Sequence, residues 1–141
     1  MSWRSVLVRR AVWVWGPAVV LMILIFLVSD ISEPPQTSGL SAANAHGIVY
    51  AVLGALMLRG VAGGRWDRVT IRSTVGAVAL TAAYGITDEW HQSFVPARMA
   101  ELQDLMADTV GAVIGVMIVW AWSIVVHRGS DAIRTSHRRA E

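Results

Sequence analysis

The last long apolar segment of the chain sets the strongest limit on what this sequence can fold into. From Leu105 to Val126 there are twenty-two residues with a single charge, Asp108. A helix that crosses a hydrocarbon layer of about 30 Å needs about 20 such residues. A second run, Ala11–Val28, has eighteen residues and no charge. Two such segments in 141 residues, with a mean hydropathy of +0.51, indicate an integral membrane protein.

Two shorter apolar stretches complete a four-helix prediction. They are only moderately hydrophobic, and the later one is rich in Ala, Gly and Thr, which suits helices that pack inside a bundle. We predict an all-α integral membrane fold with four transmembrane helices, at about 11–28, 42–62, 69–92 and 104–126. The matching domain division is a basic N-terminal tail (1–10), one membrane domain (11–126) and a basic C-terminal tail (127–141).

The basic residues predict the orientation of these helices. All twelve are arginine, and four crossings place eleven of them on one side. The positive-inside rule assigns that side to the cytoplasm, so both termini and the middle loop are predicted to be cytoplasmic, an N-in/C-in arrangement. The eleven are Arg4, Arg9, Arg10, Arg59, Arg65, Arg68, Arg72, Arg128, Arg134, Arg138 and Arg139. The opposite side receives Asp30, Glu33, Asp88, Glu89, Glu101 and Asp104, with Arg98.

A cleaved signal peptide is the alternative reading of the first apolar segment. Its eighteen residues are long for that role, and Ser29-Asp30-Ile31 is not a small-x-small cleavage site. We therefore predict a retained membrane anchor.

The densest polar stretch of the chain is "TDEWHQSFVPAR", Thr87–Arg98, directly after thirteen residues without a charge. At about 100° per residue, Glu89 lies about 100° from Asp88 and Trp90 points nearly opposite, toward lipid. One stripe of this helix carries Tyr84, Asp88, His91 and Gln92.

Polar residues of two other predicted helices lie at the same membrane face. In the fourth helix, Asp104 and Asp108 share a face with Gly111 and Gly115, a small-xxx-small pattern that permits close helix approach. The glycine face suits either an oligomer contact or packing within the chain. In the second helix, His46 and Tyr50 share a face. We predict one outward-facing polar pocket formed by His46, Tyr50, Tyr84, Asp88, His91, Gln92, Asp104 and Asp108.

Purely structural explanations exist for several of these residues. Asp104 near a helix start is favoured by the helix dipole, whereas Asp88 and Glu89 at a helix end oppose it and need a cation. An ion-pair cluster around Arg98 would supply one, and so would a histidine or a metal ion. His46 alone is equally compatible with a hydrogen-bonded core histidine.

The stretch "DEWHQSFVPARMAELQDLMADTVGAVIG" resembles the signature of the VanZ-like family of small bacterial membrane proteins. That pattern reads Asp-Glu-x-x-Gln-x-Phe-x-Pro-x-Arg, followed by an Asp and then by Asn or Asp before Thr-x-x-Gly. The matching residues are Asp88, Glu89, His91, Gln92, Phe94, Pro96, Arg98, Asp104, Asp108 and Gly111, together with His46, Tyr50 and Ser29. Two positions depart from the pattern: Ala43 and Asn44 replace an acidic residue, and Ala97 replaces a glycine.

The resemblance implies a multi-pass protein of the bacterial cytoplasmic (inner) membrane with a role in the cell envelope. The family's namesake is associated with resistance to teicoplanin, a glycopeptide that acts on cell-wall precursors. Expected partners are membrane lipids, which the basic tail contacts, and a glycopeptide or wall-precursor headgroup; no nucleic acid is expected. A second copy of the chain could also be a partner, through the face of Gly111 and Gly115.

Two functions of different classes fit these residues. The first is a metal-dependent hydrolase or transferase acting on a lipid-linked envelope substrate, with Zn²⁺ or a similar divalent ion held by His46, Asp88, His91 and Asp104. Its catalytic residues would be Asp88, Glu89, His91 and Arg98, with Glu89 as general base and Arg98 as phosphate clamp. The second is a non-enzymatic envelope protein that binds its ligand through Tyr50, Tyr84, Gln92, Asp104 and Asp108, or uses the cluster for helix packing. A transporter is a third possibility, which would need oligomerisation.

Overall fold

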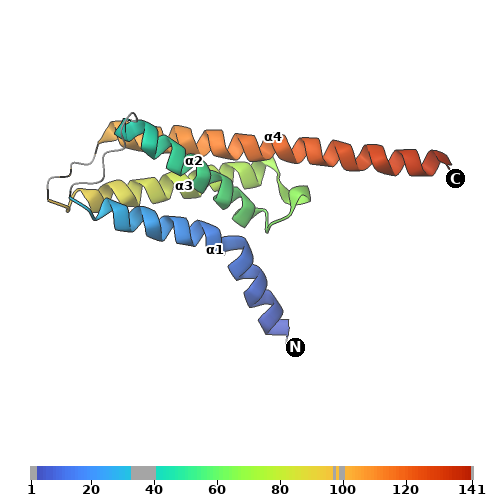
Figure 1. Ribbon diagram of the computed structural model, residues 1–141, viewed down its shortest axis with the longest axis horizontal. Coiled ribbons are helices and arrows are strands. Elements are labelled where there is room, and N and C mark those ends of the chain that lie inside the picture. The colour runs from blue at the N-terminus through green and yellow to red at the C-terminus, as the bar shows by residue number, and fades with distance from the viewer. Residues whose placement is uncertain (1–2, 33–40, 97, 99–100, 141) are drawn as a thin grey trace.

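The computed structural model describes residues 3–32, 41–96, 98 and 101–140, with side chains for all of these except Ala42 and residues 127–140. Four helices form a bundle, and the described residues contain no strand (Figure 1). The predicted all-α fold with four helices is therefore confirmed. The helices are α1 (Trp3–Ser29), α2 (Ala42–Val61), α3 (Ile71–Gln92) and α4 (Leu102–Ala140), with a 3₁₀ turn, η1 (Trp66–Arg68), before α3.

Three of the described helices are long and apolar enough to cross a membrane, within Trp3–Ser29, Ala43–Val61 and Leu102–Val126. The helix α3 is less hydrophobic because Ala, Gly and Thr occupy many of its positions. It packs against all three other helices, as the sequence predicted for a helix inside a bundle. In Figure 1 it runs between α1 and α4.

Two helices are longer than predicted. The first begins at Trp3 rather than residue 11, and the last continues to Ala140 rather than residue 126. Charged arginines mark where a helix leaves the apolar layer, but arginine is a good helix former and does not end the helix. Residues 33–40, most of the connection predicted between the first two helices, lie outside the described residues, as do the side chains of the predicted basic tail from residue 127 onward.

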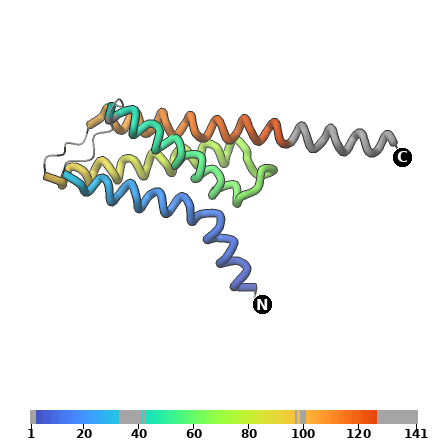
Figure 2. The backbone as a smooth tube through the Cα atoms, in the orientation of Figure 1, coloured from blue at the N-terminus to red at the C-terminus, as the bar shows by residue number. Residues whose placement is uncertain are grey.

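The first helix is bent, and its N-terminal part diverges from the bundle (Figures 1 and 2). Pro17 lies inside this helix, and proline removes the N–H that would bond to the carbonyl four residues earlier, that of Trp13. Arg59 of α2 replaces this donor: its guanidinium donates to the carbonyls of Trp13 at 2.8 Å and Val14 at 3.1 Å. The guanidinium also lies over the Trp13 ring, 5.4 Å from its centroid. The second helix thus stabilises the bend in the first.

The connection between α2 and α3 is short because two glycines make the turn. Gly63 and Gly64 have φ angles of 64° and 69°, in the left-handed region that favours glycine. Arg65 then pairs with Asp67 through both carboxylate oxygens and holds the pKa of that carboxyl below its usual range. Thr70 begins α3 with a capping box to Ser73.

The helices α2 and α4 are in backbone contact along a stripe of small residues. A Cβ built on Gly111 would lie 2.1 Å from the Gly47 carbonyl oxygen, and one built on Gly115 would lie 1.8 Å from that of Ala51. Both glycines are buried. Of the two uses suggested for this face, packing within the chain is the one that the structure shows, because α2 of the same chain contacts both glycines. The oligomer stays a prediction.

Candidate functional site

Four helix ends meet at one end of the bundle, which we call the acidic end. There α1 ends at Ser29, α3 ends at Gln92, α2 begins near His46, and α4 begins with Asp104 and Asp108. The arginines of the α2–α3 connection lie at the opposite end. Consecutive helices of the bundle run in opposite directions, so the start of α2, the end of α3 and the start of α4 lie at the same end. The predicted polar residues of these three helices are therefore close to one another.

Three side chains at the acidic end converge closely enough to hold one ion. His46, Glu89 and Asp108 each offer a ligand atom, and these atoms lie within 4.8 Å of one another. Among the residues that the structure describes, this is the only group of three such side chains close enough to share an ion. The His46 Nδ1 and Asp108 Oδ1 atoms are 3.0 Å apart, a hydrogen bond in which His46 donates when Asp108 is ionised. His46 is half-buried, Glu89 is 6% exposed and Asp108 is fully buried.

Three carboxylates of this end keep an oxygen that has no hydrogen-bond partner among the described residues: Asp88 Oδ1, Glu89 Oε1 and Asp108 Oδ2. The second oxygen of Glu89 accepts a hydrogen bond from the backbone N–H of Glu101, at 3.0 Å. A buried ionised carboxylate is costly unless it is paired or bound to a metal. The three buried carboxylates lie close together, so this end of the bundle favours the binding of a cation.

A glycine makes room for these acids. A Cβ on Gly85 would lie 3.2 Å from the Tyr50 ring and 3.3 Å from Asp108 Oδ2. Gly85 was not among the predicted site residues. On a helical wheel it falls about 60° from Asp88, between Asp88 and Glu89, so its position on the polar flank was a signal available in the sequence.

Asp88 belongs to a neighbouring hydrogen-bond network rather than to the three-residue cluster. Its Oδ2 atom accepts from the Tyr50 hydroxyl at 3.3 Å and from the Gln92 amide at 3.1 Å. Gln92 also donates to Ser29 at the end of α1, at 3.3 Å. This network connects α1, α2 and α3.

Asp104 lies at the edge of the cluster. Its Oδ2 atom is 3.9 Å from His46 Nε2, and its side chain is 17% exposed. It adds negative charge beside His46 and also occupies the first turn of α4, where the helix dipole favours an acid.

Arg98 is directed to α1, away from the cluster. In the described part of the chain its guanidinium donates to the backbone carbonyls of Val28 at 3.2 Å and Ile31 at 3.1 Å, and to Gln92 Oε1 at 3.3 Å. These bonds satisfy carbonyls at the C-terminus of α1. The alternative of an ion-pair cluster around Arg98 is not found among the described contacts.

His91 and His46 do not form a common site. The His91 ring stacks on Phe26 of α1, with 4.4 Å between the centroids. Its Nε2 atom is 3.5 Å from Asp30 Oδ1 and has no hydrogen-bond partner among the described residues. The predicted metal ligands His46, Asp88, His91 and Asp104 are thus not the group that the structure brings together; Glu89 and Asp108 accompany His46 instead.

Tyr84 lies on the α1 side of α3. Its hydroxyl donates to the Met22 carbonyl at 2.6 Å, and its ring lies 6.3 Å from that of Tyr50. Trp90 is 67% exposed, as predicted for a residue that faces lipid.

Fold and site together define a small helical protein of membrane type with a buried histidine–carboxylate cluster at one end. The chain belongs to the VanZ/LLP1 family, whose model matches residues 13–125. The predicted resemblance is therefore confirmed. No curated protein and no solved structure matches the chain.

Proposed function

We propose that this protein is a multi-pass protein of the bacterial cytoplasmic membrane that binds a divalent cation at the acidic end. In this proposal all four helices cross the membrane, both termini are cytoplasmic, and the bound ion holds a phosphate group of a lipid-linked envelope precursor. Handling such a precursor would also relate the chain to glycopeptide action, because those antibiotics act on wall precursors.

The observation that carries the proposal is the imbalance of charge around His46. Two buried carboxylates, Glu89 and Asp108, approach it, each with an oxygen that lacks a partner among the described residues. The nearby arginine, Arg98, is occupied with the carbonyls of α1. A divalent cation would neutralise the acids, since buried charges in proteins are usually paired or coordinate metals.

The ligand types favour Zn²⁺ or Mn²⁺. One imidazole and two carboxylates are borderline-to-hard ligands, and the chain has no cysteine to select a softer ion. Bonds of about 2.0–2.2 Å require ligand atoms no more than about 4.4 Å apart. The ligand atoms of His46, Glu89 and Asp108 lie within 4.8 Å of one another, so the largest separation would have to shorten by about half an ångström on binding. Three protein ligands leave a coordination position for a phosphate oxygen or for water, the starting arrangement of a hydrolase or transferase.

Metal retention tests this proposal. Metal-free protein in detergent is dialysed against Zn²⁺ or Mn²⁺ and analysed by mass spectrometry, and we expect about one ion per chain. Glu89→Gln, Asp108→Asn and His46→Ala should each weaken binding by at least about tenfold.

A matched control for metal retention is Glu101→Gln, which removes an acid with an exposed side chain from the same end. It should retain the ion like the wild type. Equal metal content in wild type, Glu89→Gln and Asp108→Asn would contradict the proposed site.

The topology is testable because the natural chain has no cysteine. Single cysteines at two exposed positions, Gln103→Cys at the acidic end and Asp67→Cys in the α2–α3 connection, can be labelled with a membrane-impermeant maleimide. In intact spheroplasts we expect labelling at position 103, and at position 67 only after lysis. The reverse pattern would place the acidic end in the cytoplasm and refute the orientation.

A further inference from the structure

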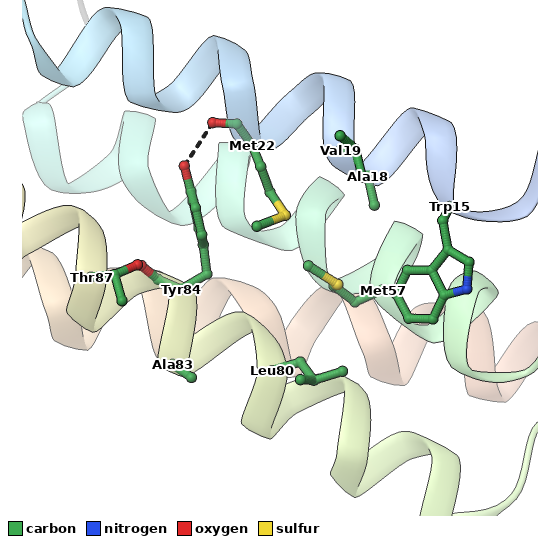
Figure 3. A pocket seen from close by; sticks show the side chains of 9 residues that line it. All are labelled: Trp15, Ala18, Val19, Met22, Met57, Leu80, Ala83, Tyr84 and Thr87. Atoms are coloured by element: carbon green, nitrogen blue, oxygen red, sulfur yellow. Dashed lines mark hydrogen bonds between the residues drawn. The ribbon is translucent and has the colours of Figure 1, made fainter. Parts of the chain in front are cut away.

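An apolar groove of about 460 Å³ lies between α1 and α3, with α2 as its floor. Figure 3 shows Trp15 at one end of it and Tyr84 and Thr87 at the other, with Met22, Met57 and Leu80 along its length. From Leu80 to Thr87 it extends over seven residues of α3, which is about 10 Å at 1.5 Å per residue.

The walls of this groove offer a hydrocarbon chain apolar contacts and little else. Both hydroxyl groups at its acidic end are already satisfied by backbone carbonyls: Tyr84 donates to Met22 at 2.6 Å, and Thr87 donates to Tyr84 at 2.7 Å. Its floor is buried, since Met57 is 5% exposed, whereas Val19 and Leu80 on its rims are about half exposed, at 48% and 47%. The groove is therefore open along its side, toward the surface that faces lipid in a membrane-spanning bundle.

At the end of the groove away from the acidic end, the Trp15 ring packs closely against α2 and closes the groove. The Trp15 ring lies against Gly60 of α2, so closely that a Cβ at Gly60 would be 2.7 Å from it. A side chain at position 60 would displace the indole, so the glycine sets where the groove ends.

The acidic end of the groove leads to His91. Phe26 lies one helical turn beyond Met22, and His91 lies one turn beyond Thr87, so their stacked rings, 4.4 Å apart, stand directly past the groove. The Nε2 atom of His91 is buried, lies 3.5 Å from Asp30 Oδ1 and has no hydrogen-bond partner among the described residues. On the other flank of the same turn of α3 is Glu89, one of the three cluster residues. A headgroup at the end of α3 would thus lie between an imidazole and the proposed cation site.

We infer that the groove between α1 and α3 holds one hydrocarbon chain of a phosphate-bearing lipid, whose phosphate lies at the end of α3 beside His91. This inference rests on the proposed function, because the cation at His46, Glu89 and Asp108 supplies the charge that attracts the phosphate from the other flank. It identifies the substrate class as a lipid that enters sideways from the bilayer.

Photolabelling tests the inference. The probe is dodecyl phosphate with a diazirine near the end of its chain, added to the full chain in phosphatidylcholine nanodiscs loaded with Zn²⁺. We expect label on Met22, Leu80 and Ala83 to exceed label on the exposed α4 residues Ile114 and Ile118 by at least fivefold. Excess unlabelled dodecyl phosphate should remove this preference, and dodecanol should compete at least fivefold less well.

Two variants separate chain binding from headgroup binding. Ala83→Trp fills the groove from an exposed rim position and should abolish the fivefold preference, whereas Ala121→Trp, at an exposed position on α4, should leave it unchanged. His91→Ala should keep the groove labelled but make dodecanol compete as well as dodecyl phosphate.

The outcomes distinguish this inference from the proposed function. Uniform labelling of all lipid-facing residues, or focused labelling that survives Ala83→Trp, would overturn the groove while metal retention still stood. Focused labelling that is equal with Zn²⁺, with chelator and in Glu89→Gln would contradict the link to the cation site. In that case the groove binds lipid without the proposed metal chemistry, and the inferred substrate role is wrong.

Discussion

Replacing Gly115 by alanine should be among the most destabilising single changes in this protein. The new methyl group would lie 1.8 Å from the Ala51 carbonyl oxygen, and a backbone atom cannot rotate away as a side chain can. Overpacking typically costs about 1–3 kcal/mol, and we expect the upper end of that range or more. At roughly 2–4 °C per kcal/mol, the thermal midpoint in detergent should fall by about 5–10 °C.

The functional consequence of this substitution follows from its place in the bundle. Gly111 and Gly115 bring α4 against α2, and Asp108 and His46 stand at the start of the same contact, 3.0 Å apart. A wider helix separation would pull these two side chains apart. Gly115→Ala should therefore also lower metal retention without altering a ligand.

Gly76→Ala is the matched control, because a Cβ there meets no atom of the described residues within 4 Å. Its stability should stay within about 0.5 kcal/mol of the wild type or rise by up to about 1 kcal/mol, since alanine favours helix. If Gly115→Ala were as stable as Gly76→Ala, the close α2–α4 packing would be wrong.

The number and order of the helices were predictable because they depend on local patterns. Apolar runs of sufficient length specify a membrane-type helix whatever it packs against. The bend in α1 was only partly predictable. Pro17 indicates where a helix weakens, but the donor that replaces its missing N–H is Arg59, which lies 46 residues from the Trp13 carbonyl along the chain. Such a partner follows from the packing of α1 on α2.

The candidate site was predicted as a neighbourhood but not as a set of partners. The predicted stripe on α3 was centred on Asp88 and His91, whereas the buried face also includes Ala77, Thr81 and Gly85, and so turns toward Glu89. Small residues such as Ala77 and Gly85 are easily overlooked when polar side chains are used to find the buried face of a helix. In this protein they lie on the side of α3 that α2 and α4 contact. For this reason Glu89 joins His46 while His91 faces α1.

The stability of Glu89→Gln should change sign with metal. In chelator, the wild type carries buried acids whose oxygens lack partners among the described residues, Glu89 Oε1 and Asp108 Oδ2. Glutamine removes one negative charge, adds an N–H donor beside the others and can still accept from the Glu101 N–H. Removing one of these buried charges removes its desolvation cost, which no partner among the described residues offsets. The variant should therefore melt at a higher temperature than the wild type.

With saturating Zn²⁺ the order should reverse. An ion that binds only the folded wild type adds about 2.7 kcal/mol at a concentration one hundred times its Kd, and the variant gains little because it has lost a ligand. Thermal melts of the wild type and Glu89→Gln, with chelator and with Zn²⁺, show whether the order of their thermal midpoints reverses. The control Glu101→Gln should melt like the wild type in both conditions. A purely structural cluster predicts that Glu89→Gln is less stable in both conditions; a functional cation site sacrifices stability of the empty protein and regains it on binding.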